Sequence, residues 1–211
     1  MRGNASKGIQ VFLILTKFSC IEGCSDCCIN REYFPSIKYG KIGVLLLPEE
    51  KLGMEIQAKK MGIRLRILPR LGVGMNKHGN GPKRVIAYQM MGKNLDGSLC
   101  PFLDTKSSQR SPHGGYTCQI YEKRPLACCA YPIIAVNNIS TTLDGKCQFC
   151  KKNFSINSEK LGLQQEIRAL KKISAEFFVD EKTQIWRYAT AIGDEKDKTK
   201  FLPEGWMPEE V

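Results

Sequence analysis

The spacing of apolar residues along the chain predicts several short strands. Continuous apolar runs over 9–15 and 40–47 are typical of strands buried on both faces. Apolar and polar residues alternate over 63–67 and again over 84–90, which predicts two paired strands joined by the glycine-rich segment 71–82. We therefore expect a sheet in the first half of the chain.

Two longer stretches have the spacing of helices. The first begins at Pro48, because proline suits the first turn and the acidic pair Glu49 and Glu50 then lies near the positive end of the helix dipole. We expect this helix to end at Gly62. The second covers 158–179, where apolar residues recur at three- and four-residue steps, and it is predicted to cover the core as a C-terminal amphipathic helix.

Shorter segments complete the predicted fold class, which is α+β with a small mixed or antiparallel sheet and helices. Two short strands over 99–103 and 116–121 are joined by a loop rich in Ser, Pro and Gly, and another strand follows over 131–136. We expect a cysteine-cluster metal-binding domain, a helical extension packed on it and a tail, with the bounds 1–155, 156–192 and 193–211.

Length and composition are those of a globular protein. The chain has 211 residues, 42% hydrophobic and 25% charged, so it can bury a core and disorder is not expected. Its 32 Lys and Arg against 21 Asp and Glu give a net charge of +11, which favours contact with polyanions but also suits a merely solubilising surface. The basic residues expected to line one helix and hairpin are Lys59, Lys60, Arg64, Arg66, Arg70, Lys77, Lys83 and Arg84.

The N-terminal apolar run is unlike an export signal. Arg2 and Lys7 precede it, but Thr, Lys and Phe occupy 16–18, where a cleavage site needs small residues. We therefore expect a cytoplasmic protein, in which disulfides are rare. Since no apolar run approaches the ~20 residues of a membrane span, no membrane contact is expected.

Ten cysteines dominate the candidate chemistry, and four of them fall within nine residues. The spacing Cys20-x3-Cys24-x2-Cys27-Cys28 lets a short stretch of backbone direct several sulfurs to one point. A short helix over 25–33 would place three of these thiols on one face. Unligated clustered thiols would oxidise easily, so we expect sulfurs from distant parts of the chain to share a metal centre. The later cysteines are Cys100, Cys118, Cys128, Cys129, Cys147 and Cys150.

Iron and zinc both suit these thiols, and disulfides stay an alternative. The chain has two histidines, ligation would be all thiolate, and the step Cys100-Pro101 is similar to cysteine-proline steps at iron-sulfur clusters. These features favour a 4Fe-4S cluster. Zinc remains the alternative cofactor because all-cysteine zinc sites are common.

The cysteines and their neighbours resemble a known family. The first motif is followed by Leu99-Cys-Pro-Phe-Leu103, by Cys118-Gln-Ile-Tyr-Glu-Lys-Arg-Pro-Leu-Ala-Cys128 and by Tyr131-Pro132. Over about residues 11–136, this combination resembles the CxxCxxCC cysteine-cluster family of zinc- or iron-chelating domains. It is also similar to the cysteine cluster of flagellin lysine methylases.

The resemblance implies that the metal ligands are drawn from Cys20, Cys24, Cys27, Cys28, Cys100, Cys118 and Cys128. The chain departs from the family pattern at Cys129, where arginine is usual. Because seven ligands cannot be shared evenly between two four-coordinate sites, Cys129, Cys147 and Cys150 are candidate ligands of a second centre.

Tyr121 and Arg124 are expected next to the ligands rather than among them. Arg124 would pair with a carboxylate or a carbonyl and so hold the turn that presents Cys128, while Tyr121 packs. The alternative is that Arg124 donates toward cluster sulfurs or an anionic substrate.

Three functions from different classes fit the sequence. The first is a metal-binding protein whose centre has a structural or electron-transfer role, with a protein partner supplying any chemistry. The second is a zinc-stabilised basic module that binds RNA or a ribonucleoprotein. The third, an iron-sulfur-dependent, methylase-like enzyme, rests on the family analogy alone, so enzyme status and catalytic residues stay open.

Overall fold

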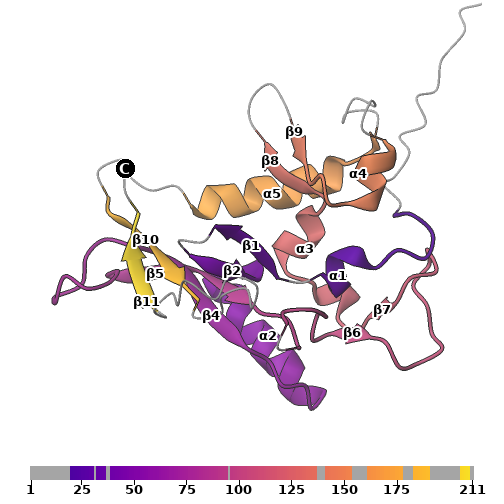
Figure 1. Cartoon of the computed structure of the whole chain (residues 1–211), viewed down its shortest axis with the longest axis horizontal. Coiled ribbons are helices and arrows are strands. Elements are labelled where there is room, and N and C mark those ends of the chain that lie inside the picture. Colours follow the sequence, from indigo (N-terminus) through magenta and orange to yellow (C-terminus); the bar gives the residue numbers. More distant parts are fainter. Residues whose placement is uncertain are drawn as a thin grey trace, which may run out of the picture.

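The computed structural model describes most of the chain. The described residues are 20–30, 32–36, 39–94, 96–136, 141–153, 161–177, 183–190 and 205–209. The strand predicted over 9–15 lies outside them. Within these ranges the fold is α+β, as predicted, with helices set against small antiparallel sheets (Figure 1).

The largest sheet gathers segments from both ends of the described chain. It has five antiparallel strands in the order β11-β10-β4-β5-β3. The strands are β3 (Val44–Leu46), β4 (Ile67–Val73), β5 (Arg84–Met90), β10 (Ile185–Ala189) and β11 (Gly205–Pro208). The hairpin of β4 and β5 therefore connects the early strand β3 to the two late strands.

The alternation over 63–67 does not mark a paired strand, because β4 begins at Ile67. Ile63 and Leu65 pack against the core instead, and this packing accounts for their alternation with arginines. By contrast, β5 has the bounds that the sequence predicts.

The strand predicted over 40–47 is divided at Gly43 into β2 (Gly40–Ile42) and β3. Only glycine fits here, since a Cβ would lie 2.2 Å from the Met90 carbonyl oxygen. The Gly43 N–H donates to Oε1 of the buried Gln89 at 3.0 Å. Before this break, β2 pairs with β1 (Tyr33–Ser36) rather than with the large sheet.

Helix α2 (Pro48–Lys60) packs against the large sheet and closes the main core. Its start is fixed by Glu50, whose Oε2 accepts a hydrogen bond from the Leu47 N–H at 2.9 Å. Its inner face buries Met54 and Ala58. The core cluster consists of Leu46, Met54, Ala58, Met90, Cys100, Phe102 and Ile120, so a cysteine is part of it.

Short elements build the remainder of the described chain. They are α1 (Asp26–Ile29), β6 (Leu103–Asp104), β7 (Thr117–Cys118), the 3-10 helix η1 (Tyr121–Lys123), α3 (Leu126–Ala130), β8 (Ile133–Val136), β9 (Thr141–Leu143), α4 (Gln148–Lys152) and α5 (Gln164–Glu176). None of the helices in the described ranges is long and apolar enough to cross a membrane.

Helix α5 lies inside the stretch for which the sequence predicts an amphipathic helix. It packs on α3 and β8, with Ala169 and Ile173 buried beside Ala130. It begins at Gln164 rather than at the predicted 158, because Gly162 just before it adopts the left-handed φ of 67°. Residues 158–160 lie outside the described ranges.

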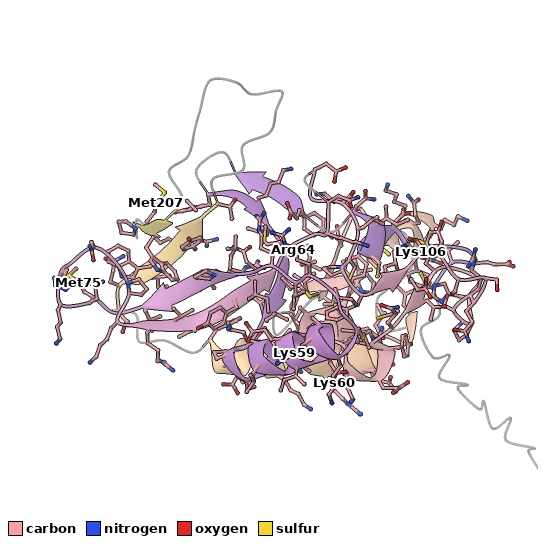
Figure 2. The ribbon with its side chains drawn as sticks, turned by 90° about the horizontal axis from the view of Figure 1, so that it is seen from below. Lys59, Lys60, Arg64, Met75, Lys106 and Met207 are labelled. Atoms are coloured by element: carbon pink, nitrogen blue, oxygen red, sulfur yellow. The ribbon has the colours of Figure 1, made fainter. Side chains whose placement is uncertain are left out.

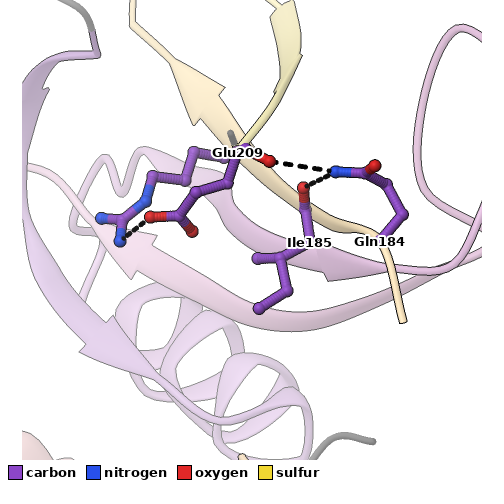
Figure 3. Close-up of polar contacts among 4 residues, drawn as sticks. Gln184, Ile185 and Glu209 are labelled. Atoms are coloured by element: carbon purple, nitrogen blue, oxygen red, sulfur yellow. Dashed lines mark hydrogen bonds and ion pairs between the residues drawn. The ribbon is translucent and has the colours of Figure 1, made fainter. Parts of the chain in front are cut away.

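The last described residues join the sheet as its edge strand, β11. Arg187 of β10 forms an ion pair with Glu209 at 2.5 Å. Gln184 Nε2 donates to the carbonyl oxygens of Ile185 at 2.8 Å and Glu209 at 3.3 Å (Figure 3). Part of the predicted tail is thus paired, while the predicted domain bounds remain predictions.

Candidate metal centre

The first four cysteines lie on a turn and one short helix. Cys20 and Cys24 precede α1, whereas Cys27 and Cys28 belong to it. The helix closes through a hydrogen bond from the Cys28 N–H to the Ser25 carbonyl oxygen at 2.9 Å. It ends at Ile29, earlier than the predicted 33, because the chain then enters β1.

The loop between β6 and β7 supports this turn. The Gly23 N–H donates to the His113 carbonyl oxygen at 2.6 Å, and a His113 ring nitrogen lies 3.0 Å from the Cys24 carbonyl oxygen. The Tyr116 N–H donates to the buried Ser25 hydroxyl at 2.8 Å. The sequence marks this segment only as a connecting loop, because its partners are distant in the chain.

Four cysteines from separate segments lie around the β6–β7 hairpin, and we name them the hairpin thiols: Cys28, Cys100, Cys118 and Cys128. The Cys100 N–H donates to the Cys28 carbonyl oxygen at 2.6 Å. Cys118 is paired with Leu103 across the hairpin, and it packs with Cys28 against the core that contains Cys100. Burial, and then the thiols of Cys28 and Cys128, raise the pKa of Cys118, although a hydrogen bond from the Ile120 N–H lowers it.

A second set of four, the α4 thiols, consists of Cys20, Cys24, Cys147 and Cys150. Cys147 precedes the first turn of α4 and Cys150 lies within the helix, and both are buried. The thiols of Cys20 and Cys24 are hydrogen-bonded to each other, as are those of Cys147 and Cys150. Burial and the paired thiol raise the pKa of Cys20 to about 11 and that of Cys150 to about 12.

The other two cysteines lie beside these sets. Cys27 Sγ is 3.9 Å from Cys28 Sγ, near the ~3.8 Å that separates two sulfurs on one tetrahedral zinc ion. Cys129 Sγ lies 3.8 Å from the Arg124 carbonyl oxygen. Burial raises the pKa of Cys129, and the nearby Arg124 charge opposes that shift.

All ten cysteines fall within the described ranges, and none of them is in a disulfide. Across those ranges, no three His, Cys, Asp or Glu side chains are arranged so that they could hold a metal ion together. The thiols are thus gathered by the backbone as pairs and near neighbours. A centre would require side-chain rotation about Cα–Cβ, which moves a sulfur between staggered positions without moving the backbone.

Arg124 makes the kind of contact that was expected of it. Its Nε donates to the Tyr121 carbonyl oxygen at 2.9 Å, and its guanidinium lies 3.8 Å from the centre of the Tyr121 ring. The guanidinium charge also acts on Cys118 and Cys129. Holding the turn and placing a positive charge near the thiols are therefore compatible, and both roles stay predictions.

A cleft of about 320 Å³ opens beside Cys27. Its lining combines acidic, basic, amide and phenolic groups, and the Lys146 ammonium lies 4.3 Å from the centre of the Tyr33 ring. The lining residues are Asp26, Cys27, Asn30, Glu32, Tyr33, Tyr131, Lys146, Gln148 and Lys151. Residues of both α1 and α4 therefore line this cleft.

The basic residues are distributed along the molecule. Lys59 and Lys60 end α2, whereas Lys77 and Lys83 lie in the β4–β5 connection, at the far end of those strands. Figure 2 shows Met75, in that connection, well separated from Lys59 and Lys60. A polyanion would have to follow the length of β4 to contact both groups, and nucleic-acid binding stays a prediction.

Comparison with known protein families finds a match that covers the cysteines. The sequence model of the CxxCxxCC family, described as "putative zinc- or iron-chelating domain", matches residues 19–160. That span contains all ten cysteines. Among curated proteins and solved structures, none matches the chain.

Proposed function

Because the chain belongs to the CxxCxxCC family of zinc- or iron-chelating domains, we propose that it is a metal protein whose hairpin thiols hold a 4Fe-4S cluster, with zinc as the alternative. The proposed role is structural or electron-transferring. Cys28, Cys100, Cys118 and Cys128 would supply the four thiolate ligands.

The observation that carries the proposal is the convergence of these thiols from four separate segments. They come from α1, from the segment before β6, from β7 and from α3. A backbone hydrogen bond and core packing gather Cys28, Cys100 and Cys118, and Cys128 acts electrostatically on Cys118. Four sulfurs and no other donor type suit iron-sulfur clusters and all-cysteine zinc sites. Neither of the two histidines belongs to the set.

The electrostatics of the metal-free thiols support a bound cation. Neighbouring sulfurs raise one another's pKa because two thiolates repel, as at Cys118. A cation reverses this preference and binds the deprotonated sulfurs, so ligation would remove the repulsion.

Groups of this chain would tune such a centre. The Ile120 N–H donates to the Cys118 sulfur, and the Arg124 charge acts on the same residue. Hydrogen bonds and positive charge at the sulfurs set the reduction potential of an iron-sulfur cluster. When bound, a cluster supplies one-electron transfer, whereas zinc would supply only cross-linking.

Anaerobic purification followed by metal quantitation and an absorption spectrum tests the proposal. An iron-sulfur protein is brown and absorbs near ~400 nm, whereas a zinc protein is colourless. Iron with sulfide and a ~400 nm band would support the cluster, and zinc without colour would support the alternative. A chain that folds and contains neither metal contradicts the proposal.

The other two functions stay predictions. RNA binding would appear as retention that weakens steeply with salt. Methylase-like activity rests on family analogy, and no residue is proposed as catalytic. Cytoplasmic localisation and a protein partner also remain predictions.

A further inference from the structure

Helix α4 lies against the beginning of the described chain, although more than half of the sequence separates them. Gln148 Nε2 of α4 donates to Asp26 Oδ2 of α1 at 3.0 Å. Figure 1 shows the first described residues passing beneath α4 before they enter α1. Two of the α4 thiols, Cys20 and Cys24, lie on the turn before α1, and the other two, Cys147 and Cys150, lie at the start of α4 and within it.

The α4 thiols already stand as two hydrogen-bonded pairs. Cys20 pairs with Cys24 on the turn, and Cys147 pairs with Cys150 on α4. Cys147 and Cys150 are only 6% and 4% exposed. Cys147 also acts electrostatically on Cys20, so the two pairs are near each other. No three of the four thiols are arranged to hold an ion in the described structure, so the site would form by side-chain rotation about Cα–Cβ.

The α4 thiols and the hairpin thiols belong to different parts of the fold. Figure 1 places α1 between α4 and the β6–β7 hairpin. Cys28, Cys100 and Cys118 lie in or against the core formed with α2 and β5, whereas Cys147 and Cys150 lie by Asp144 and the β8–β9 hairpin. Each set contains four sulfurs, the number that one tetrahedral or cubane centre takes.

We infer that Cys20, Cys24, Cys147 and Cys150 form a second metal site, distinct from the hairpin thiols, which holds a structural zinc ion. The inference rests on the proposed function in that it takes the thiols of this chain to be metal ligands. It adds a second centre, its ligand set and its metal.

Spacing and burial favour zinc at this second site. Structural zinc sites commonly combine two short-spaced pairs of ligands, such as Cys-x2-Cys and Cys-x3-Cys. The two pairs here have those spacings, and they come from two short elements that already touch. Cys147 and Cys150 are buried and Cys20 and Cys24 are half-buried, and four such thiolates suit a four-coordinate structural ion that catalyses nothing.

Such an ion would fasten α4 to the turn before α1. In the described structure the Gln148–Asp26 hydrogen bond is a polar contact between these elements. Zinc bound by four thiolates would contribute far more to the folding free energy. It would also hold α1, and with it Cys28 of the other centre, in place.

The test compares double serine variants of the full chain, purified anaerobically, with iron, sulfide and zinc quantified per chain. Cys147→Ser with Cys150→Ser is expected to remove about one zinc per chain and leave the iron content and the ~400 nm band unchanged. Cys100→Ser with Cys118→Ser is expected to remove the iron and keep the zinc. Cys129→Ser is the matched control and should retain both metals.

The outcomes separate the two proposals. If the wild-type chain binds no metal, both are wrong. If it binds metal that Cys147→Ser with Cys150→Ser leaves intact, only the second site is wrong. The same holds if each double variant loses both metals together, which would indicate a single centre.

Alkylation of the wild-type chain keeps the test decisive if a variant fails to fold. Brief treatment with a zinc chelator should expose Cys20, Cys24, Cys147 and Cys150 to iodoacetamide together, with the hairpin thiols still protected. Mass spectrometry would locate the modified cysteines. Simultaneous exposure of all eight thiols would overturn the second site.

Discussion

The backbone N–H of Cys100 donates a hydrogen bond to the carbonyl oxygen of Cys28 at 2.6 Å. The Leu99 N–H likewise donates to the Ile29 carbonyl oxygen at 2.7 Å, so two segments far apart in the chain are held side by side. The backbone thus positions these thiols. Serine at a single thiol should therefore remove a ligand and keep the scaffold.

Adjacent cysteines on α3 offer a matched test of the hairpin thiols. We expect Cys128→Ser to weaken metal retention at this centre by at least about tenfold, because one of four ligands is lost. Cys129→Ser should leave retention unchanged, since its thiol lies 3.8 Å from the Arg124 carbonyl oxygen and is not one of the hairpin thiols. Competition with a chelator measures both, and equal loss in the two variants would contradict the assignment.

Glu50 joins α2 to the helix that carries Cys128. Its Oε1 accepts from the Leu126 N–H at 2.7 Å, at the start of α3, while Oε2 accepts from Leu47. Glu50→Gln removes the charge and one of the two acceptors, and we expect the free energy of unfolding to fall by about 1–2 kcal/mol. Urea unfolding measures this change.

Glu49 on the same turn is the control, because it is exposed. Glu49→Gln should change stability by no more than about 0.5 kcal/mol. If the two variants behave alike, the Glu50 bridge contributes nothing specific.

Two glycines should respond to alanine in opposite directions. At Gly115 a Cβ would lie 2.3 Å from the Cys24 carbonyl oxygen and 2.7 Å from the Ser25 hydroxyl, so Gly115→Ala should destabilise the chain by about 1–3 kcal/mol. At Gly53, exposed within α2, a Cβ meets nothing within 4 Å, and Gly53→Ala should add about 0.5–1 kcal/mol. Thermal or urea unfolding of both variants checks the prediction, and a stabilised Gly115→Ala would refute the close contact with the cysteine turn.

Alkaline pH should destabilise the metal-free, reduced chain. The folded state raises the pKa of Cys20 from 9.0 to about 11 and that of Cys150 to about 12, so it favours the protonated thiols. When the pH lies between the ordinary cysteine pKa of 9.0 and these raised values, the unfolded chain binds fewer protons than the folded one. The contribution of these two thiols to the free energy of unfolding is therefore fully present below pH about 9 and is lost as the pH rises toward 11 and 12.

Urea unfolding of chelator-treated protein from pH 7 to pH 11 would show this decline. The double variant Cys20→Ser with Cys150→Ser should show a shallower one. Metal-loaded protein should lack this contribution, because its thiols are already deprotonated. Stability that rises with pH in the metal-free chain would be inconsistent with the buried, protonated thiols.

Local sequence pattern determined the elements whose residues are close in the chain. The alternation of β5 and the Pro48-Glu49-Glu50 start of α2 appear where they were predicted, because strand faces and helix ends depend on neighbouring residues. The same patterns overestimated the strand over 63–67 and missed the break at Gly43. Both errors arise from contacts with distant parts of the core.

The sequence by itself determined that this is a cysteine-cluster protein with an α+β fold, since thiol spacing and flanking motifs are local. It also identified ten candidate thiols, but it did not assign them to separate metal sites. Only the tertiary structure decided which thiols are neighbours: Cys100 meets Cys28 through a backbone hydrogen bond, and α4 brings Cys147 to Cys20. The physical reason is that such pairings depend on how hairpins and helices pack over long separations, which no local spacing encodes.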